Sequence, residues 1–182
     1  MKILAVVGSP RLMGNTNYLV DQALEEAASM GADTRKIVLS QYQIKPCLGH
    51  DECASFESCR QKDDTGRILD QFCEADGVIL ATPVYWYNVS AQMKTFIDRN
   101  YFPYRHDRKC LARTVGIIVV ADTEGIEDTL YTLNQFIDWS FSLKGGGKFI
   151  VTGYTNKLGE AKNDLPLVDK ARMLGRQMAA VI

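Results

Sequence analysis

The chain has 182 residues, with 21 lysines and arginines against 22 aspartates and glutamates, and a formal net charge of −1. This balance gives no overall field that would attract nucleic acid or an acidic membrane surface. The longest apolar run, residues 115–121, is too short for a membrane span, and the N-terminal run stops at Gly8-Ser9-Pro10 without a signal-peptide pattern. We therefore expect one soluble, cytoplasmic domain over residues 1–182, with neither nucleic acid nor membrane as a partner.

Short apolar runs alternate with amphipathic segments along the whole chain. The expected strands are residues 3–7, 34–39, 77–81, 114–121 and 148–153. The expected helices are residues 15–30, 66–72, 90–100, 126–141 and a C-terminal one with Leu167, Val168, Ala171, Leu174 and Met178 at core spacing. Apolar strands that alternate with helices are typical of a parallel sheet covered on both faces. We predict a doubly wound α/β fold of five parallel strands in the flavodoxin-like order 2-1-3-4-5.

Sheets of this kind bind ligands beyond the carboxyl ends of their strands, where the strand order reverses. Here that point lies between the first and third strands. The loop after the first strand reads Gly-Ser-Pro-Arg-Leu-Met-Gly-Asn-Thr over residues 8–16 and leads directly into a helix. Helix N-termini carry unpaired N–H groups and a partial positive charge, which suit a phosphate. The candidate anion ligands are Ser9, Arg11, Gly14, Asn15 and Thr16; the alternative is that Asn15 or Thr16 merely caps the helix.

The loop after the third strand, residues 82–88, carries three successive aromatic side chains in Thr-Pro-Val-Tyr-Trp-Tyr-Asn. Successive aromatics at a strand end point in different directions, so they suit a core poorly. They suit the wall of a site for a flat aromatic ligand, with backbone N–H groups near its polar edge. The alternative is a mixture of core aromatics and a subunit contact.

These two loops, followed by Ser-Ala-Gln-Met-Lys-Thr-Phe-Ile-Asp-Arg at residues 90–99, resemble the NAD(P)H-dependent FMN reductase and iron–sulfur flavoprotein group. The resemblance covers the order of elements over essentially the whole chain, with specific motifs at residues 8–16, 44–64 and 75–99. It implies an FMN cofactor whose phosphate is held by Ser9, Arg11, Gly14, Asn15 and Thr16. It implies an isoalloxazine site lined by Pro83, Val84, Tyr85, Trp86, Tyr87 and Asn88, with Asp122 or Thr123 near the other edge. The Asp98-Arg99 pair of the family we interpret as a structural ion pair at a helix end.

A cysteine-containing loop at about residues 44–64 carries Cys47, His50, Cys53 and Cys59 ahead of Asp63-Asp64. By the same resemblance, iron–sulfur flavoproteins have four closely spaced cysteines here, and His50 occupies the second position. A four-iron cluster normally needs four thiolates, whereas three Cys and one His also suit zinc. The third alternative is a loop without metal whose thiols stay free. Cys73 and Cys110 are expected to be small buried hydrophobic residues.

Flavin itself accepts hydride from a nicotinamide and passes one or two electrons on, so we expect no catalytic residue from the protein. The main hypothesis is an NAD(P)H-dependent oxidoreductase that reduces flavin, a quinone or another small-molecule acceptor. The alternatives are an iron–sulfur flavoprotein electron carrier fed by a ferredoxin or reductase, and a non-enzymatic flavin or thiol redox sensor. Because the ring often lies at a subunit boundary in this fold group, residues 101–104 could cover it from a neighbouring chain. We accordingly expect a homodimer or homotetramer.

Overall fold

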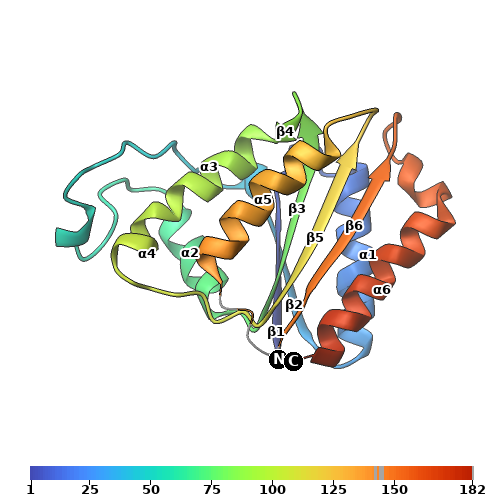
Figure 1. The fold of residues 1–182 in the computed structure, drawn as a ribbon, viewed down its shortest axis with the longest axis horizontal. Coiled ribbons are helices and arrows are strands. Elements are labelled where there is room, and N and C mark those ends of the chain that lie inside the picture. The colour runs from blue at the N-terminus through green and yellow to red at the C-terminus, as the bar shows by residue number, and fades with distance from the viewer. Residues whose placement is uncertain (142, 144–145, 182) are drawn as a thin grey trace.

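The computed structural model describes residues 1–141, 143 and 146–181, and Figure 1 shows how their helices and strands are arranged. The sheet has five parallel strands in the order β2-β1-β3-β5-β6, and a sixth short strand, β4, pairs with β3. The strands are β1 (Lys2–Val7), β2 (Asp33–Val38), β3 (Gly77–Tyr85), β4 (Asn88–Val89), β5 (Thr114–Ala121) and β6 (Lys148–Tyr154). The α-helices are α1 (Asn15–Ser29), α2 (Thr65–Glu74), α3 (Ala91–Arg99), α4 (Tyr101–Arg105), α5 (Ile126–Ser140) and α6 (Leu165–Val181).

The predicted parallel, doubly wound architecture is confirmed, but the predicted strand count and numbering need correction. The extra strand β4 is antiparallel to the end of β3, so the parallel strands follow the order 2-1-3-5-6 rather than 2-1-3-4-5. The third strand was also expected to close before Pro83, yet it runs to Tyr85. β1 pairs with β3 only as far as Ala81, so Pro83 lies where one side of β3 is an open edge. A proline without an N–H is tolerated at such an edge.

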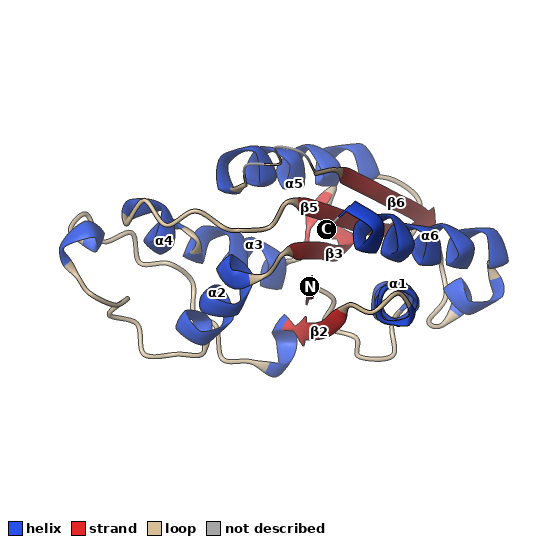
Figure 2. Cartoon of the chain, turned by 90° about the horizontal axis from the view of Figure 1, so that it is seen from below, coloured by secondary structure: helices blue, strands red, loops and turns tan. Residues whose placement is uncertain are grey.

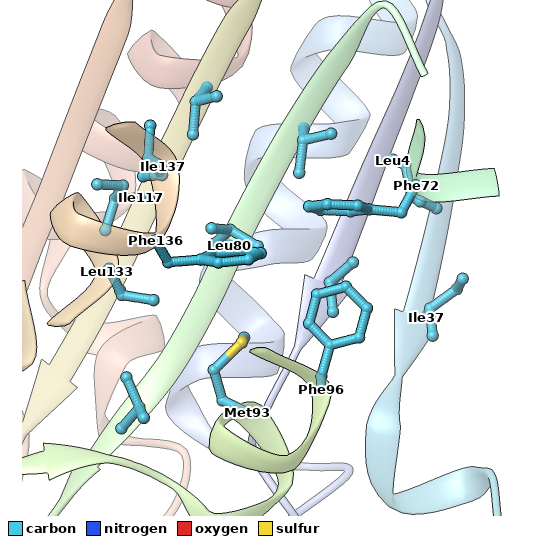
Figure 3. Packing of buried hydrophobic residues seen from close by; sticks show 14 of the residues in the cluster. Leu4, Ile37, Phe72, Leu80, Met93, Phe96, Ile117, Leu133, Phe136 and Ile137 are labelled. Atoms are coloured by element: carbon cyan, nitrogen blue, oxygen red, sulfur yellow. The ribbon is translucent and has the colours of Figure 1, made fainter. Parts of the chain in front are cut away.

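Helices cover both faces of the sheet, as the apolar strands predict. Figure 2 shows α1 and α6 on one face and α2, α3 and α5 on the other. The second face is packed around aromatic rings: Phe72 and Phe96 lie edge to face with their centroids 5.0 Å apart (Figure 3). Among the described residues, no helix is long and apolar enough to cross a membrane.

The first and third strands are joined closely at their carboxyl ends. The Gly8 N–H donates to the Ala81 carbonyl at 2.7 Å, and the buried Ser90 hydroxyl donates to the Gly8 carbonyl at 2.6 Å. The Ser90 Oγ also accepts from the Met93 N–H and thereby caps α3. A Cβ at Gly8 would lie 2.7 Å from the Ser90 Oγ, so only glycine fits here. The loops that leave β1 and β3 therefore start from one rigid point, with α1 on one face and α3 on the other.

Candidate functional site

A cavity of about 490 Å³ opens at the carboxyl edge of the sheet, between the loops that follow β1, β3, β5 and β6. This volume is within the range of small-molecule sites. Its lining contains Ser9, Arg11, Gly14, Asn15, Thr16, Pro83, Val84, Tyr85, Trp86, Val120, Ala121, Asp122, Thr155, Asn156 and Leu158. The two loops singled out from the sequence thus meet at one cavity, at the point where the strand order reverses.

The N-terminus of α1 faces this cavity without a side-chain cap. Its N-cap residue is Gly14, which makes no capping hydrogen bond, and the first turn holds no acidic residue. Asn15 and Thr16 lie inside the helix, so the alternative in which one of them is the cap is wrong. The first N–H groups of a helix have no partner within it and carry partial positive charge. A Cβ at Gly14 would lie 2.9 Å from the Arg11 carbonyl, so the tight turn between them needs glycine.

Asn15 lines the cavity, but its side chain is already engaged with the loop after β6. The amide donates to the Thr155 hydroxyl at 2.7 Å and to the Lys157 carbonyl at 2.8 Å. Its oxygen accepts from the Ala161 N–H at 3.1 Å. The side chain therefore positions the fourth loop against the N-terminus of α1, and the backbone of Asn15 is the part that remains available to an anion.

The loop after β3 is a hairpin whose turn consists of Trp86 and Tyr87. Both have positive φ, 50° and 61°, the conformation of a two-residue turn that glycine or asparagine normally occupies. Aromatic residues adopt this backbone only at a cost of about 1–3 kcal/mol each. Gly125, before α5, supports the turn, because a Cβ there would lie 2.8 Å from the Tyr87 Cα. The result is a Trp86 side chain that is 95% exposed at the cavity mouth.

Ten of the twelve cofactor residues expected from the sequence line the cavity, and Tyr87 and Asn88 do not. The tight turn directs Tyr87 to Glu124, to which its phenol donates at 2.6 Å; this hydrogen bond raises the pKa of Tyr87. The Asn88 oxygen accepts from the Val89 N–H within the hairpin. Neither side chain lines the cavity, and the assignment of both residues to the ring wall stays a prediction.

Sequence reasoning missed the fourth loop, after β6, which contributes Thr155, Asn156 and Leu158. When the side-chain nitrogen of Asn156 faces Asp122, it donates to the Asp122 carbonyl at 2.7 Å. Asn156 thereby links the loop after β6 to the loop after β5. Nothing in the local sequence marks this loop. The available signal was topological: β6 neighbours β5, so its carboxyl end lies at the same edge.

The cysteine loop lies away from this cavity, as the extended segment between β2 and α2 in Figure 1. Cys53 is buried, and burial together with the nearby thiols Cys47 and Cys59 raises its pKa. Within the described residues, no three His, Cys, Asp or Glu side chains converge to hold a metal ion. Three thiols and His50 also fall short of the four thiolates that a cubane cluster normally has. This arrangement does not fit a cluster, and the metal assignment to Cys47, His50, Cys53 and Cys59 stays a prediction.

The two ends of the cysteine loop are held together by a buried ion pair between Asp63 and Arg99. The Arg99 Nη1 donates to the Asp63 carboxylate at 2.5 Å and to the Lys45 carbonyl at 2.8 Å, and the Nη2 lies 3.4 Å from the Cys59 sulfur. Asp98 instead pairs with Lys94, at 2.6 Å. Arg99 thus has a structural role, as expected, but its partner comes from the loop rather than from the helix end.

The chain is similar to known redox proteins over its whole length. Residues 1–155 match the family described as NADPH-dependent FMN reductase. An iron-sulfur flavoprotein of Methanocaldococcus jannaschii is 35% identical over 100% of this chain and 97% of its own. A proposed NAD(P)H-dependent FMN-containing oxidoreductase of Bacillus subtilis, YwqN, is also 35% identical, over 100% of both. The structure of an NAD(P)H:quinone oxidoreductase from Methanothermobacter marburgensis superposes with a TM-score of 0.74 over 97% of this chain and 96% of that one, at 15% identity, which supports the fold.

Proposed function

The chain belongs to the NADPH-dependent FMN reductase family, and on this basis we propose that it passes electrons from NAD(P)H through FMN to a quinone or another small acceptor. It is a flavin-type oxidoreductase with FMN as cofactor and NAD(P)H as donor. One observation carries the proposal for the site: an uncapped helix N-terminus and an aromatic hairpin border the same cavity.

The phosphate of FMN fits the loop after β1. The first residues of α1 line the cavity, no side chain caps the helix, and no acidic residue lies in its first turn. Arg11 adds a positive charge, and none of the described residues forms an ion pair with it. Ser9 and Thr16 are almost fully buried hydroxyls beside the same turn. We propose that the backbone of residues 14–16, with Ser9, Arg11 and Thr16, holds the phosphate, while Asn15 orders the neighbouring loop.

The isoalloxazine is proposed to lie against Pro83, Val84 and Tyr85, with Asp122 on the opposite side of the cavity. When bound, FMN supplies the hydride and electron transfer chemistry. The protein then has three tasks: it orients the ring, excludes water from its buried face and leaves the other face accessible. The strand end and the hairpin accomplish the first two because Ser90 and Gly125 fix their positions.

Trp86 is proposed to be the contact for the acceptor. Its indole is exposed at the cavity mouth and held there by an unfavourable backbone conformation. Strained residues are concentrated at functional sites, and a planar side chain stacks with planar partners such as quinones. A flat acceptor is therefore favoured over a bulky or strongly charged one.

The exposed hairpin also supports a proposed homodimer or homotetramer. Tyr85, Trp86 and Tyr87 are all exposed, which forms an apolar surface beside the site in the isolated chain. A second copy that packs there would border the mouth of the cavity. The expectation that residues 101–104 supply that cover stays a prediction. Light scattering at micromolar concentration tests the assembly, and a monomer would contradict it.

The name of the Methanocaldococcus relative supports a second candidate function, an iron–sulfur electron carrier fed by another redox protein. The donor set in the cysteine loop disfavours it, because one of the four positions is His50. Iron and sulfide analysis after anaerobic purification distinguishes the two. About four irons per chain would favour the carrier, and none would favour the reductase.

Steady-state assays with NADH and NADPH, each paired with a benzoquinone, free FMN or ferricyanide, test the proposed function. We expect oxidation of at least one nicotinamide with the quinone, and a lower turnover for Trp86→Ala with unchanged FMN content. Tyr131→Ala is the matched control, since Tyr131 is an exposed aromatic residue on α5 outside the cavity lining. No turnover with any pair would refute the proposal.

A further inference from the structure

A second cavity, of about 510 Å³, lies between α4, the segment 107–110 and α5. Apolar side chains supply most of the surface of its walls, and they are Ile97, Tyr101, Pro103, Tyr104, Phe136 and Trp139. Two acidic residues, Asp98 and Asp107, and two basic ones, Arg108 and Lys109, also line it, so their charges balance. Cys110 is the nucleophilic side chain in this lining. Cys110 precedes β5, at the amino edge of the sheet, whereas the proposed FMN site occupies the carboxyl edge. The two sites are therefore at opposite ends of the parallel strands.

Behind Cys110 lies a second thiol. The sulfur atoms of Cys110 and Cys73 are 3.0 Å apart, within a buried contact that joins α2 to the chain ahead of β5. Cys73 is 2% exposed and Cys110 8%, and Cys110 but not Cys73 lines the cavity. One sulfur is thus reached from the cavity and the other lies directly behind it.

The backbone holds the two cysteines together independently of their sulfurs. The Leu111 N–H donates to the Cys73 carbonyl at 2.9 Å, and the Arg113 N–H donates to the Asp76 carbonyl at 2.9 Å. The backbone of Cys110 also forms an isolated parallel β-bridge with that of Phe141. The segment before β5 is therefore fixed against the end of α2, which keeps the thiols close whatever their oxidation state.

The electrostatics favour ionisation of the pair. A hydrogen bond from Cys110 lowers the pKa of the Cys73 thiol; burial opposes this and Arg108 adds to it. The same contact and burial raise the pKa of Cys110, so the first negative charge of the pair lies on Cys73. The Cys73 thiolate lies 3.0 Å from the Cys110 sulfur, where it accepts the proton of Cys110 as Cys110 attacks a disulfide in the cavity.

We propose that Cys73 and Cys110 are an oxidisable thiol pair, and that the aromatic cavity admits a small uncharged organic disulfide to Cys110. Cys110 attacks one sulfur of the disulfide RSSR and its proton passes to Cys73; a protein–SR bond forms, the RS–SR bond breaks, and the first RSH leaves with the proton that Cys73 had released. Cys73 then attacks the Cys110 sulfur; the Cys73–Cys110 bond forms, the bond to SR breaks, and the second RSH leaves with the proton of Cys73. Two protein thiols are oxidised and one RSSR is reduced to two RSH. This reaction is independent of FMN because the two sites lie at opposite edges.

The test uses the purified holoprotein, incubated anaerobically with 2-hydroxyethyl disulfide. Remaining thiols are then blocked with N-ethylmaleimide in denaturant, and the protein is digested without reduction for mass spectrometry. We expect a linked peptide pair that contains Cys73 and Cys110. A variant that lacks Cys47, Cys53 and Cys59 should form the same link at the same rate, since those thiols lie in another loop.

Two single substitutions test the order of attack. Cys73→Ser should stop at a mixed disulfide on Cys110, while Cys110→Ser should leave Cys73 unmodified over the same time, because Cys73 does not face the cavity. The proposal is overturned if native wild-type protein, after incubation with the disulfide, yields both cysteines as maleimide adducts, while protein incubated with the same disulfide in denaturant forms the link. It is also overturned if Cys73 in Cys110→Ser reacts as fast as Cys110 in Cys73→Ser. The wild-type peptide map alone decides the main point if either variant folds poorly.

Discussion

Replacing Asp63 by Asn should strongly destabilise the protein, because it leaves a buried guanidinium without its carboxylate. The side chains of Arg99 and Asp63 are 2% and 0% exposed, and their ion pair is 2.5 Å long. Removing one member of a buried pair typically costs about 3–5 kcal/mol. The matched control is Asp98→Asn, next to Arg99 on α3. Its pair with Lys94 is half exposed, and such a pair between residues four apart contributes roughly 0.3–0.5 kcal/mol.

The same pair predicts a distinct dependence of stability on pH. Burial by itself would raise the pKa of Asp63, but hydrogen bonds from Arg99 and from the Lys45 and Thr65 N–H groups outweigh it and lower the pKa to about 2. A carboxyl whose pKa is depressed on folding contributes stability that is complete above its unfolded value of 3.8 and is lost as the pH falls toward about 2. The depression corresponds to roughly 2 kcal/mol. Asp63→Asn should lack this part of the acid dependence.

Urea unfolding of wild type, Asp63→Asn and Asp98→Asn at neutral pH measures the first effect, and a series toward low pH measures the second. Limited proteolysis adds a local measurement, since Asp63→Asn should expose residues 42–64 to cleavage sooner. A loss below about 1 kcal/mol for Asp63→Asn, or equal losses for both variants, would refute the reasoning, because a buried unpaired charge must cost more than a surface pair.

Three further predictions concern the site and the thiol pair. Arg11→Gln should weaken FMN binding by about tenfold or more in a fluorescence titration, since a charge-assisted contact is lost, while Arg35→Gln on β2 should not; equal affinities would contradict the phosphate assignment. Trp86→Gly should stabilise the fold by about 1 kcal/mol because glycine accepts the positive φ, yet lower quinone turnover about tenfold; a loss of stability would argue against strain. Oxidation of Cys73 and Cys110, separated by 37 positions, should raise the free energy of unfolding by roughly 4 kcal/mol, and an unchanged urea midpoint would count against a native link.

The fold was largely predictable because apolar periodicity and a short list of allowed connections determine a parallel sheet. The strands expected at residues 114–121 and 148–153 agree with β5 and β6 to within one residue. The error was local: Pro83 was interpreted as the end of the third strand. β3 continues past it because β1 pairs with β3 only as far as Ala81, so no partner strand needs the missing N–H of Pro83 on that side. The expected helix end at residue 141 agrees to within one residue with α5, which ends at Ser140.

The cavity was predictable in part for the same reason. The order of strands places the loops after β1 and β3 together, so the residues of both could be named from their positions. The directions of individual side chains could not. The positive φ of Tyr87 turns it toward Glu124, and the amide of Asn15 is occupied by a loop 140 residues away in sequence. The partner of Arg99 likewise required the tertiary structure, because Asp98 is adjacent in sequence but faces Lys94.

The central claim is that this cavity holds an FMN that is reduced by a nicotinamide. The most direct measurement is the absorption spectrum of anaerobically purified protein, reconstituted with FMN, before and after addition of NADH and then NADPH. The account predicts flavin bands that bleach with at least one nicotinamide, and that the bands are much weaker in Arg11→Gln at equal FMN because less is bound. A protein that takes up no FMN, or one whose bound flavin stays oxidised with both nicotinamides, would contradict it.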